Sequence, residues 1–164
     1  MDLSPAFLLE FANRIGAAAQ NVMEVARFGG LETDEVPSPF EVTYEHRTYR
    51  LRRYFPDLVP TTKRQRLARP PVVLVPPMML SADVYDVAPA ISAVAHLAAA
   101  GIDPWVVDFG APENEEGGLE RTLTDHVLAV SDAVDRVREQ TGRDVHLGGY
   151  SQGGMFCYQA AAYR

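Results

Sequence analysis

The chain has 164 residues, of which 47% are hydrophobic and 23% charged, and its formal net charge is −7. This composition suits one globular domain, and the acidic balance argues against a nucleic-acid partner and against attachment to anionic membranes. The chain has one cysteine, which excludes an internal disulfide, and it lacks a basic signal peptide and any apolar run of ~18 residues. We therefore expect a cytoplasmic protein, at most peripheral to a membrane or to lipid inclusions.

The first predicted element is an amphipathic helix within residues 1–30. Ser4 is a suitable N-cap and Pro5 a suitable first helical residue, because proline is tolerated there. The helix either packs on its own domain or serves as a partner or lipid-surface helix, although its polar face carries few basic residues. Residues 31–39, which include two prolines and several acids, follow as a linker.

Residues 40–46 and 49–55 alternate apolar and polar side chains, which predicts two half-buried strands in a hairpin. A short basic run comes next. Its members are Lys63, Arg64, Arg66 and Arg69. This run is either a solvated loop or a contact for a phosphate, such as that of coenzyme A.

The remainder of the chain alternates strands with helices. The expected strands span residues 71–75, 105–109 and 145–150, and the expected helices span residues 88–100 and 122–140. Thr122 and Asp125 resemble a capping box at the start of the second helix. Such alternation predicts an α/β fold, with a mostly parallel sheet covered by helices on both faces.

Gly149-Tyr150-Ser151-Gln152-Gly153 has the G-x-S-x-G pattern of a nucleophile elbow. It lies between an apolar strand and a helix-like run, which is the setting that the motif requires. The turn strains the serine backbone, and strand and helix approach so closely that Gly149 and Gly153 must be small. We therefore predict Ser151 as a nucleophile; the alternative is a glycine-rich turn with a surface serine.

Acyl transfer passes through a tetrahedral oxyanion that needs preorganised N–H donors. The residue after the nucleophile, Gln152, supplies one donor, and the loop after an earlier strand supplies the other. Pro76 and Pro77 have no N–H, so the Met78 amide is the first candidate in that loop and the Met79 amide the second. Alternatively, the proline pair only ends the strand.

Three other residues receive structural roles. Cys157 is expected to be a buried structural thiol, His146 a core histidine within its strand, and Asp108 a minor polar contact at the end of another strand.

A catalytic triad in this fold runs serine, acid, histidine along the chain, yet no Asp, Glu or His follows Ser151 here. A serine hydroxyl without an adjacent base is a weak nucleophile. We therefore expect residues 40–164 to be an incomplete α/β-hydrolase core that ends after the helix following the elbow. The acid and histidine are expected downstream in the same polypeptide, so this segment alone is expected to be inactive.

The sequence resembles one branch of the α/β-hydrolases, the polyhydroxyalkanoate synthases and their lipase-like relatives. The resemblance covers about residues 40–164 and rests on the elbow and on Pro71–Pro77, Ala82–Val87 and Val106–Pro112. Synthases of that family carry a cysteine at the elbow, where this chain has Ser151. This departure favours lipase, thioesterase or acyltransferase chemistry over polyester synthesis.

The chain also resembles the N-terminal part of long actinobacterial proteins in which such a hydrolase domain precedes an acyl-CoA synthetase domain. No adenylate-forming motif is present in these 164 residues.

Together these patterns predict serine-dependent transfer of an acyl group from an ester or thioester to water or an alcohol. Acyl-CoA is a candidate substrate, and neither a cofactor nor a metal is predicted. Two alternatives stay open: a non-catalytic protein that binds lipid or sits on lipid inclusions, and an inactive fragment of a bifunctional lipase and acyl-CoA synthetase.

Overall fold

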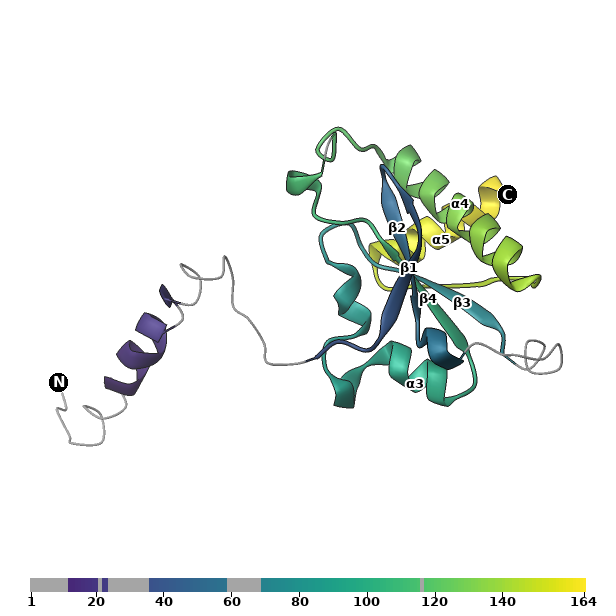
Figure 1. Ribbon diagram of the computed structural model, residues 1–164. Coiled ribbons are helices and arrows are strands. Elements are labelled where there is room, and N and C mark those ends of the chain that lie inside the picture. The colour runs from purple at the N-terminus through teal and green to yellow at the C-terminus, as the bar shows by residue number, and fades with distance from the viewer. Residues whose placement is uncertain (1–11, 21, 24–35, 59–68, 116) are drawn as a thin grey trace. The chain divides into compact units, whose positions relative to one another are not determined.

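The computed structural model describes residues 12–20, 22–23, 36–58, 69–115 and 117–164 (Figure 1). The chain divides into two compact units, Met1–Glu35 and Val36–Arg164. In the first unit, residues 12–20 and 22–23 are helical. The rest of the predicted helix in residues 1–30, and most of the predicted linker, lie outside the described residues.

The second unit carries the sheet and its helices. Its strands are β1 (Phe40–His46), β2 (Tyr49–Tyr54), β3 (Pro71–Val75), β4 (Asp103–Asp108) and β5 (His146–Gly149). Its α-helices are α3 (Ala93–Ala99), α4 (Leu123–Thr141) and α5 (Gln152–Tyr163), and its short 3-10 helices are η1 (Pro56–Leu58), η2 (Ala82–Tyr85), η3 (Pro89–Ile91) and η4 (Pro112–Asn114).

The described strands form a five-stranded sheet in the order β1-β2-β4-β3-β5. β1 pairs with β2 and β2 with β4 in antiparallel fashion, whereas β3 runs parallel to both β4 and β5. The α/β class is as predicted, but the parallel part is limited to β4, β3 and β5. Within the described sheet, β5 is an end strand that pairs only with β3.

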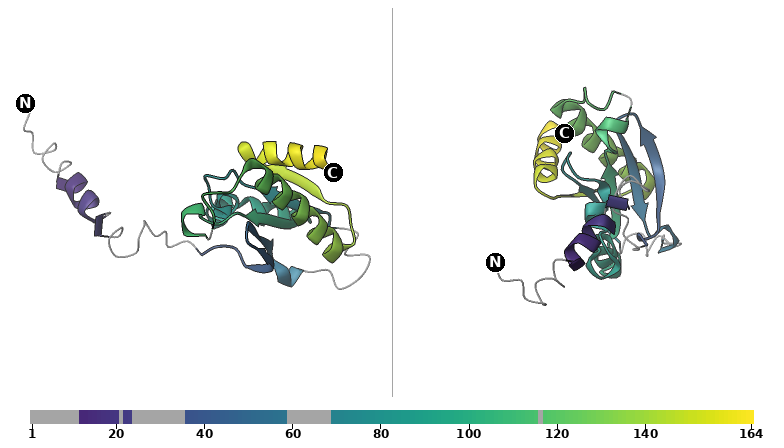
Figure 2. Two further views of the ribbon diagram at one scale, coloured as in Figure 1. Left: turned by 90° about the horizontal axis from the view of Figure 1, so that it is seen from above. Right: turned by 90° about the vertical axis from the view of Figure 1, so that its left-hand side faces the viewer.

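Helices cover both faces of this sheet. Val73 and Val75 pack into the apolar cluster formed with α4 and α5, whereas Leu74 packs into the cluster that includes α3. This alternation follows from the two-residue period of a strand. Figures 1 and 2 show α4 and α5 together on one side of the sheet and α3 on the other. The β3–β4 and β4–β5 crossovers therefore use opposite faces.

The capping box predicted for α4 is present: the Thr122 side chain accepts from the Asp125 amide, and the Asp125 carboxylate accepts from the Thr122 amide at 2.7 Å. The helix predicted over residues 88–100, by contrast, is interrupted. Pro89 lies in the 3-10 turn η3, and α3 begins only after Ser92, whose side chain accepts from the Ala95 amide. Ser92 thus caps a new helix in the middle of the predicted one.

The prediction of a core position for His146 is wrong, because its side chain is exposed. β5 is an end strand of the described sheet, so this part of it is left uncovered. Among the described helices, none combines the length and the apolarity that crossing a bilayer requires.

Candidate functional site

The turn between β5 and α5 holds Ser151 in an unusual backbone conformation. Its φ is 52° and its ψ −119°, and Phe55 is the other described non-glycine residue with a positive φ. A non-glycine residue there is strained, and such strain gathers at functional turns. The Ser151 hydroxyl caps no backbone amide of α5. The turn therefore presents a serine whose side chain is not used to start the helix.

Two glycines allow the close approach that creates this turn. A Cβ at Gly149 would overlap the backbone of Gly153, and a Cβ at Gly153 would overlap the carbonyl of Val75. The first turn of α5 is therefore pressed against the carboxyl end of β3. Neither position has room for a Cβ.

The loop after β3 meets this turn through one hydrogen bond. The Met78 amide donates to Oε1 of Gln152 at 3.2 Å. Pro76 and Pro77 are buried, and the Leu80 amide donates to the Pro77 carbonyl at 3.2 Å, so the loop has a defined path. The structure thus brings together the two residues predicted as oxyanion donors, but the Met78 N–H is engaged by the Gln152 side chain.

Tyr85 supports the same junction, and sequence analysis gave it no role. Its hydroxyl donates to the Val75 carbonyl at 2.7 Å and accepts from the Tyr150 amide at 3.0 Å. Burial raises the pKa of this phenol to about 12, so it stays protonated and can donate. Tyr85 lies within Ala82–Val87, a segment that carries the resemblance described above, which was the available signal.

Three histidines of the described second unit, His46, His96 and His126, make hydrogen bonds away from the Ser151 turn. The pairs are His46 Nδ1 with Thr48 Oγ1 at 3.1 Å, His96 Nδ1 with the Ser92 carbonyl at 2.7 Å, and His126 Nδ1 with the Thr122 carbonyl at 2.8 Å. His126 is buried, and its ring stacks on Phe156 with 5.4 Å between centroids. None of these bonds involves Ser151.

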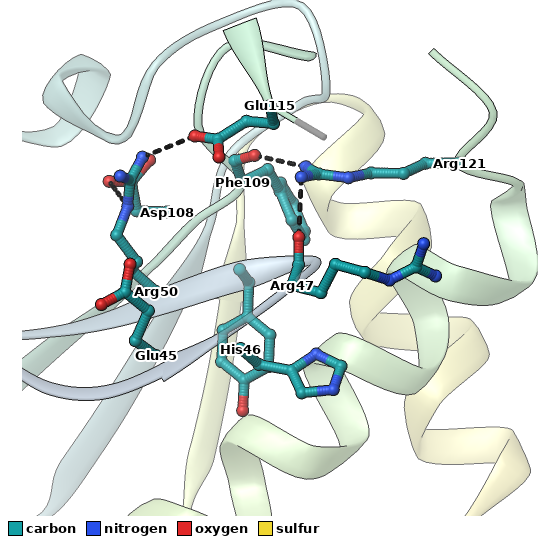
Figure 3. A pocket seen from close by; sticks show the side chains of 9 residues that line it. Glu45, His46, Arg47, Arg50, Asp108, Phe109, Glu115 and Arg121 are labelled. Atoms are coloured by element: carbon teal, nitrogen blue, oxygen red, sulfur yellow. Dashed lines mark hydrogen bonds and ion pairs between the residues drawn. The ribbon is translucent and has the colours of Figure 1, made fainter. Parts of the chain in front are cut away.

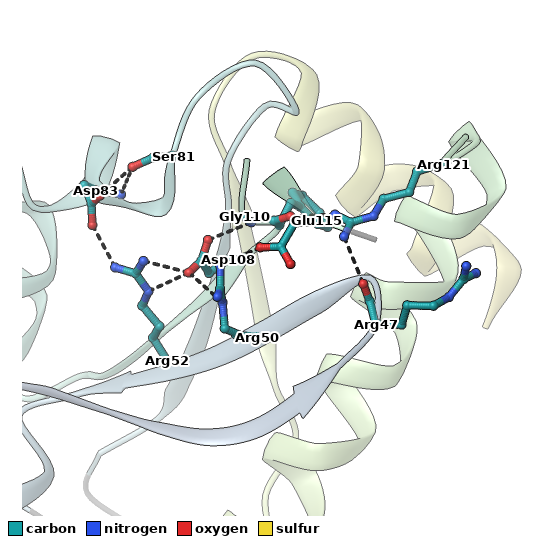
Figure 4. A network of polar contacts seen from close by, with 10 residues as sticks. Arg47, Arg50, Arg52, Ser81, Asp83, Asp108, Gly110, Glu115 and Arg121 are labelled. Atoms are coloured by element: carbon teal, nitrogen blue, oxygen red, sulfur yellow. Dashed lines mark hydrogen bonds and ion pairs between the residues drawn. The ribbon is translucent and has the colours of Figure 1, made fainter. Parts of the chain in front are cut away.

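A charge network lies at the carboxyl end of β4 (Figure 4). The carboxylate of Asp108, whose side chain is 4% exposed, accepts from Nε and Nη2 of Arg52 at 3.0 and 2.7 Å and from the Gly110 amide at 2.9 Å. Nε of Arg50 lies 3.4 Å from it, and Nη1 of Arg52 also contacts Asp83 at 2.7 Å. Asp108 is therefore a principal anchor between β2 and β4 rather than a minor contact.

The network continues toward the β1–β2 turn (Figure 3). Arg50 pairs with Glu115 at 3.1 Å, while Arg121 donates to the Phe109 carbonyl at 2.6 Å and to the Arg47 carbonyl at 2.9 Å. Arg121 thereby joins the loop after β4 to the hairpin. Since Arg50 and Arg52 are both matched by carboxylates, this network holds strands and loops together and is not a ready phosphate site.

An open groove of about 620 Å³ lies between the loops after β3 and β4. Its apolar lining includes Met78, Met79, Leu80, Ala111, Pro112 and Leu119. Its polar lining includes Arg50, Arg52, Ser81, Asp108 and Glu113. Met78 belongs both to this groove and to the contact with Gln152, so the groove adjoins the Ser151 turn.

Two further predictions concern Cys157 and the basic run. Cys157 is only partly buried, and desolvation raises the pKa of its thiol to about 11, which favours the protonated, weakly nucleophilic thiol at neutral pH. Arg69 donates to the carbonyls of Leu58 and Ile102 at 2.7 and 3.0 Å, so this member of the basic run has a structural role. The other members lie outside the described residues.

The described Asp, Glu, His and Cys side chains form no group of three suited to a metal ion.

No protein-family model matches this chain. Among curated proteins, it is similar to a poly(3-hydroxyalkanoate) polymerase subunit of Haloferax mediterranei, with 28% identity over 155 residues. The chain is a distant homologue of that polymerase. The alignment covers 93% of this chain but 29% of the length of the polymerase subunit. This similarity and the α/β fold agree with the resemblance to polyhydroxyalkanoate synthases that the sequence predicted.

Proposed function

We propose that Ser151 is the nucleophile of an acyl-transfer site whose first half lies in this chain. The observation that carries the proposal is the positive φ of Ser151 at the junction of β5 and α5, beside the loop that follows β3. A nucleophile elbow needs this strand–turn–helix arrangement. The distant similarity to a polymerase of acyl units supports the same class of chemistry.

The sheet topology supports this position. The chain leaves the carboxyl ends of β3 and β5 toward opposite faces, as the separate clusters of η2 with α3 and of α4 with α5 indicate. Ligands of open α/β sheets bind at such switch points, outside the carboxyl ends of the strands. Ser151 and Met78 follow the two adjacent strands that flank this point.

In the proposed reaction, Oγ of Ser151 forms a bond to the acyl carbon while its proton passes to a general base. The carbonyl oxygen becomes an oxyanion and accepts hydrogen bonds from the amides of Gln152 and Met78. Collapse of this intermediate breaks the bond to the leaving alkoxide or thiolate, which takes up a proton. Water or an alcohol then attacks the acyl carbon of the acyl-serine and gives its proton to the base. The acyl–Oγ bond breaks, Oγ takes that proton back, and the acid or ester product leaves.

We propose that the general base and its acidic partner come from further polypeptide. His46, His96 and His126 make hydrogen bonds away from Ser151, His146 is exposed on β5, and the polymerase subunit extends well beyond the aligned part. An acyl ester or thioester, with acyl-CoA as the candidate, would place its chain against Met78, Met79 and Leu80 in the groove. These side chains are 39%, 80% and 42% exposed, and methionine adapts to flexible apolar ligands.

The same exposed apolar side chains favour a second candidate, a non-catalytic protein that binds lipid. One experiment separates the two. The native polypeptide is treated in cell extract with a fluorophosphonate, captured with an antibody to residues 36–164, weighed and mapped. Labelling at Ser151 supports acyl transfer.

Ser151→Ala should abolish the label, whereas Ser81→Ala, at an exposed serine beside the same groove, should retain it. Absence of label on the parent polypeptide would leave lipid binding as the better explanation.

A further inference from the structure

The Met78 amide has one hydrogen to donate, and Oε1 of Gln152 accepts it at 3.2 Å. A carboxamide oxygen is a neutral carbonyl oxygen, chemically close to the carbonyl of an ester or thioester. The Gln152 side chain therefore occupies the position in which the Met78 amide would receive the acyl oxygen. Substrate and side chain compete for the same N–H.

The backbone on both sides of this contact is fixed. Pro76 and Pro77 are buried and have restricted φ, and the turn closed by the Leu80 amide holds the loop. On the other side, Gly153 is packed against the carboxyl end of β3 with no room for a Cβ. A rotation of the Gln152 side chain would therefore break this contact without moving either backbone segment.

We propose that the Gln152 side chain is an intramolecular latch that occupies the Met78 amide until an acyl carbonyl displaces it. This inference rests on the proposed acyl-transfer function and assigns the carboxamide a role separate from that of the Gln152 backbone amide. The closed latch leaves one oxyanion donor unavailable. Since a net hydrogen bond in partly exposed surroundings is modest, the open form is a minor but accessible state.

The latch predicts a faster reaction when the carboxamide is removed. Gln152→Met keeps the length of the side chain and the backbone N–H but lacks the acceptor, and Gln152→Asn keeps the carboxamide but is shorter by one methylene. Both variants should react with a fluorophosphonate about two- to tenfold faster than the parent polypeptide. Gln159→Met, the same substitution further along α5, is the matched control and should not change the rate.

Hydrogen–deuterium exchange tests the contact independently of chemistry. Peptides spanning Pro76–Leu80 report few amides, because the two prolines have none. Exchange in this segment should be faster in both Gln152 variants and unchanged in Gln159→Met, with equal far-UV circular dichroism throughout. Unchanged exchange, or slower labelling in Gln152→Met, would overturn the latch. Altered exchange without label on any polypeptide, the parent included, would instead refute the acyl-transfer proposal while leaving the contact established.

Discussion

Ser151 combines a strained backbone with a side chain that does not cap the helix it precedes. Serine commonly satisfies free amides at a helix start, and here that stabilisation is not used. A strained residue persists only when its surroundings hold it in place. Here those surroundings are the two glycine contacts and the hydrogen bonds of Tyr85.

Replacing Ser151 by cysteine tests the chemical environment of this turn. A thiol beside the N-terminus of α5 should have a lowered pKa, whereas burial raises the pKa of Cys157 to about 11. At about pH 8 we expect Ser151→Cys to react with iodoacetamide at least tenfold faster than the parent chain, as followed by mass spectrometry. The slow reaction of Cys157 should accelerate as the pH rises toward its pKa. Equal rates in both proteins would contradict an accessible, activated position 151.

The close approach of α5 to β3 predicts a difference between neighbouring glycines. Gly153→Ala forces a Cβ against the Val75 carbonyl and should reduce the free energy of unfolding by about 3 kcal/mol. At Gly154 the nearest atom to such a Cβ is 3.3 Å away, so Gly154→Ala should change stability by less than about 1 kcal/mol. Urea unfolding of both variants measures this, and similar losses would argue against the tight junction.

Strands β2 and β4 are joined by side-chain ion pairs as well as by backbone hydrogen bonds. Arg52, whose side chain is 14% exposed, pairs with Asp108 and Asp83, and Asp108→Asn removes the buried one of these two carboxylates. Breaking such a pair leaves a poorly solvated cation, so we expect a loss of about 3 kcal/mol in the free energy of unfolding. The control is Asp83→Asn, since Asp83 is 60% exposed and exposed pairs contribute at most about 1 kcal/mol. Equal losses in urea unfolding would contradict a larger contribution from the buried Asp108 pair than from the exposed Asp83 pair.

Patterns on single elements predicted most of the fold. β3 and β4 follow from short apolar runs, and α4 follows from the capping box of Thr122 and Asp125. The break at Ser92 and the exposure of His146 were missed for different reasons. Ser92 lies inside an apolar periodic run, which locally predicts the interior of a helix. The burial of His146 depends on the position of its strand in the sheet, which the strand's own sequence does not indicate.

The contact between Met78 and Gln152 was likewise predictable only in part. The motif spacing predicted that the loop after β3 would approach the serine turn, and the structure brings these residues into contact. No pattern in the sequence indicates that the Gln152 side chain takes the Met78 amide, because that depends on side-chain conformation. The hydrogen bonds of the Tyr85 hydroxyl could not be predicted either, because they join residues that only the folded structure brings together. Ser151 as nucleophile stays a prediction.

The end strand β5 lies close to exposed apolar side chains of the following turn and helix. Tyr150, Met155, Tyr158 and Tyr163 are 57%, 60%, 83% and 66% exposed. Unpaired strand edges and apolar surface promote association. We expect the 164-residue chain to self-associate with rising concentration in analytical ultracentrifugation.

Tyr158→Glu should weaken this association, whereas Leu58→Glu, an exposed position outside α5, should not. A monomer at all concentrations would contradict this use of the β5 edge and the α5 surface.

The central place of β3 also has a consequence for synthesis on the ribosome. β3 pairs with β4 on one side and with β5 on the other. Val75 therefore lacks its pairing partner Gly149 until β5 has been synthesised. At ordinary rates of translation this delay is about 4–15 s. During that time the apolar edge of β3 that will receive β5 is open to other chains. The nascent polypeptide should therefore depend on a holding chaperone until the turn bearing Ser151 has emerged.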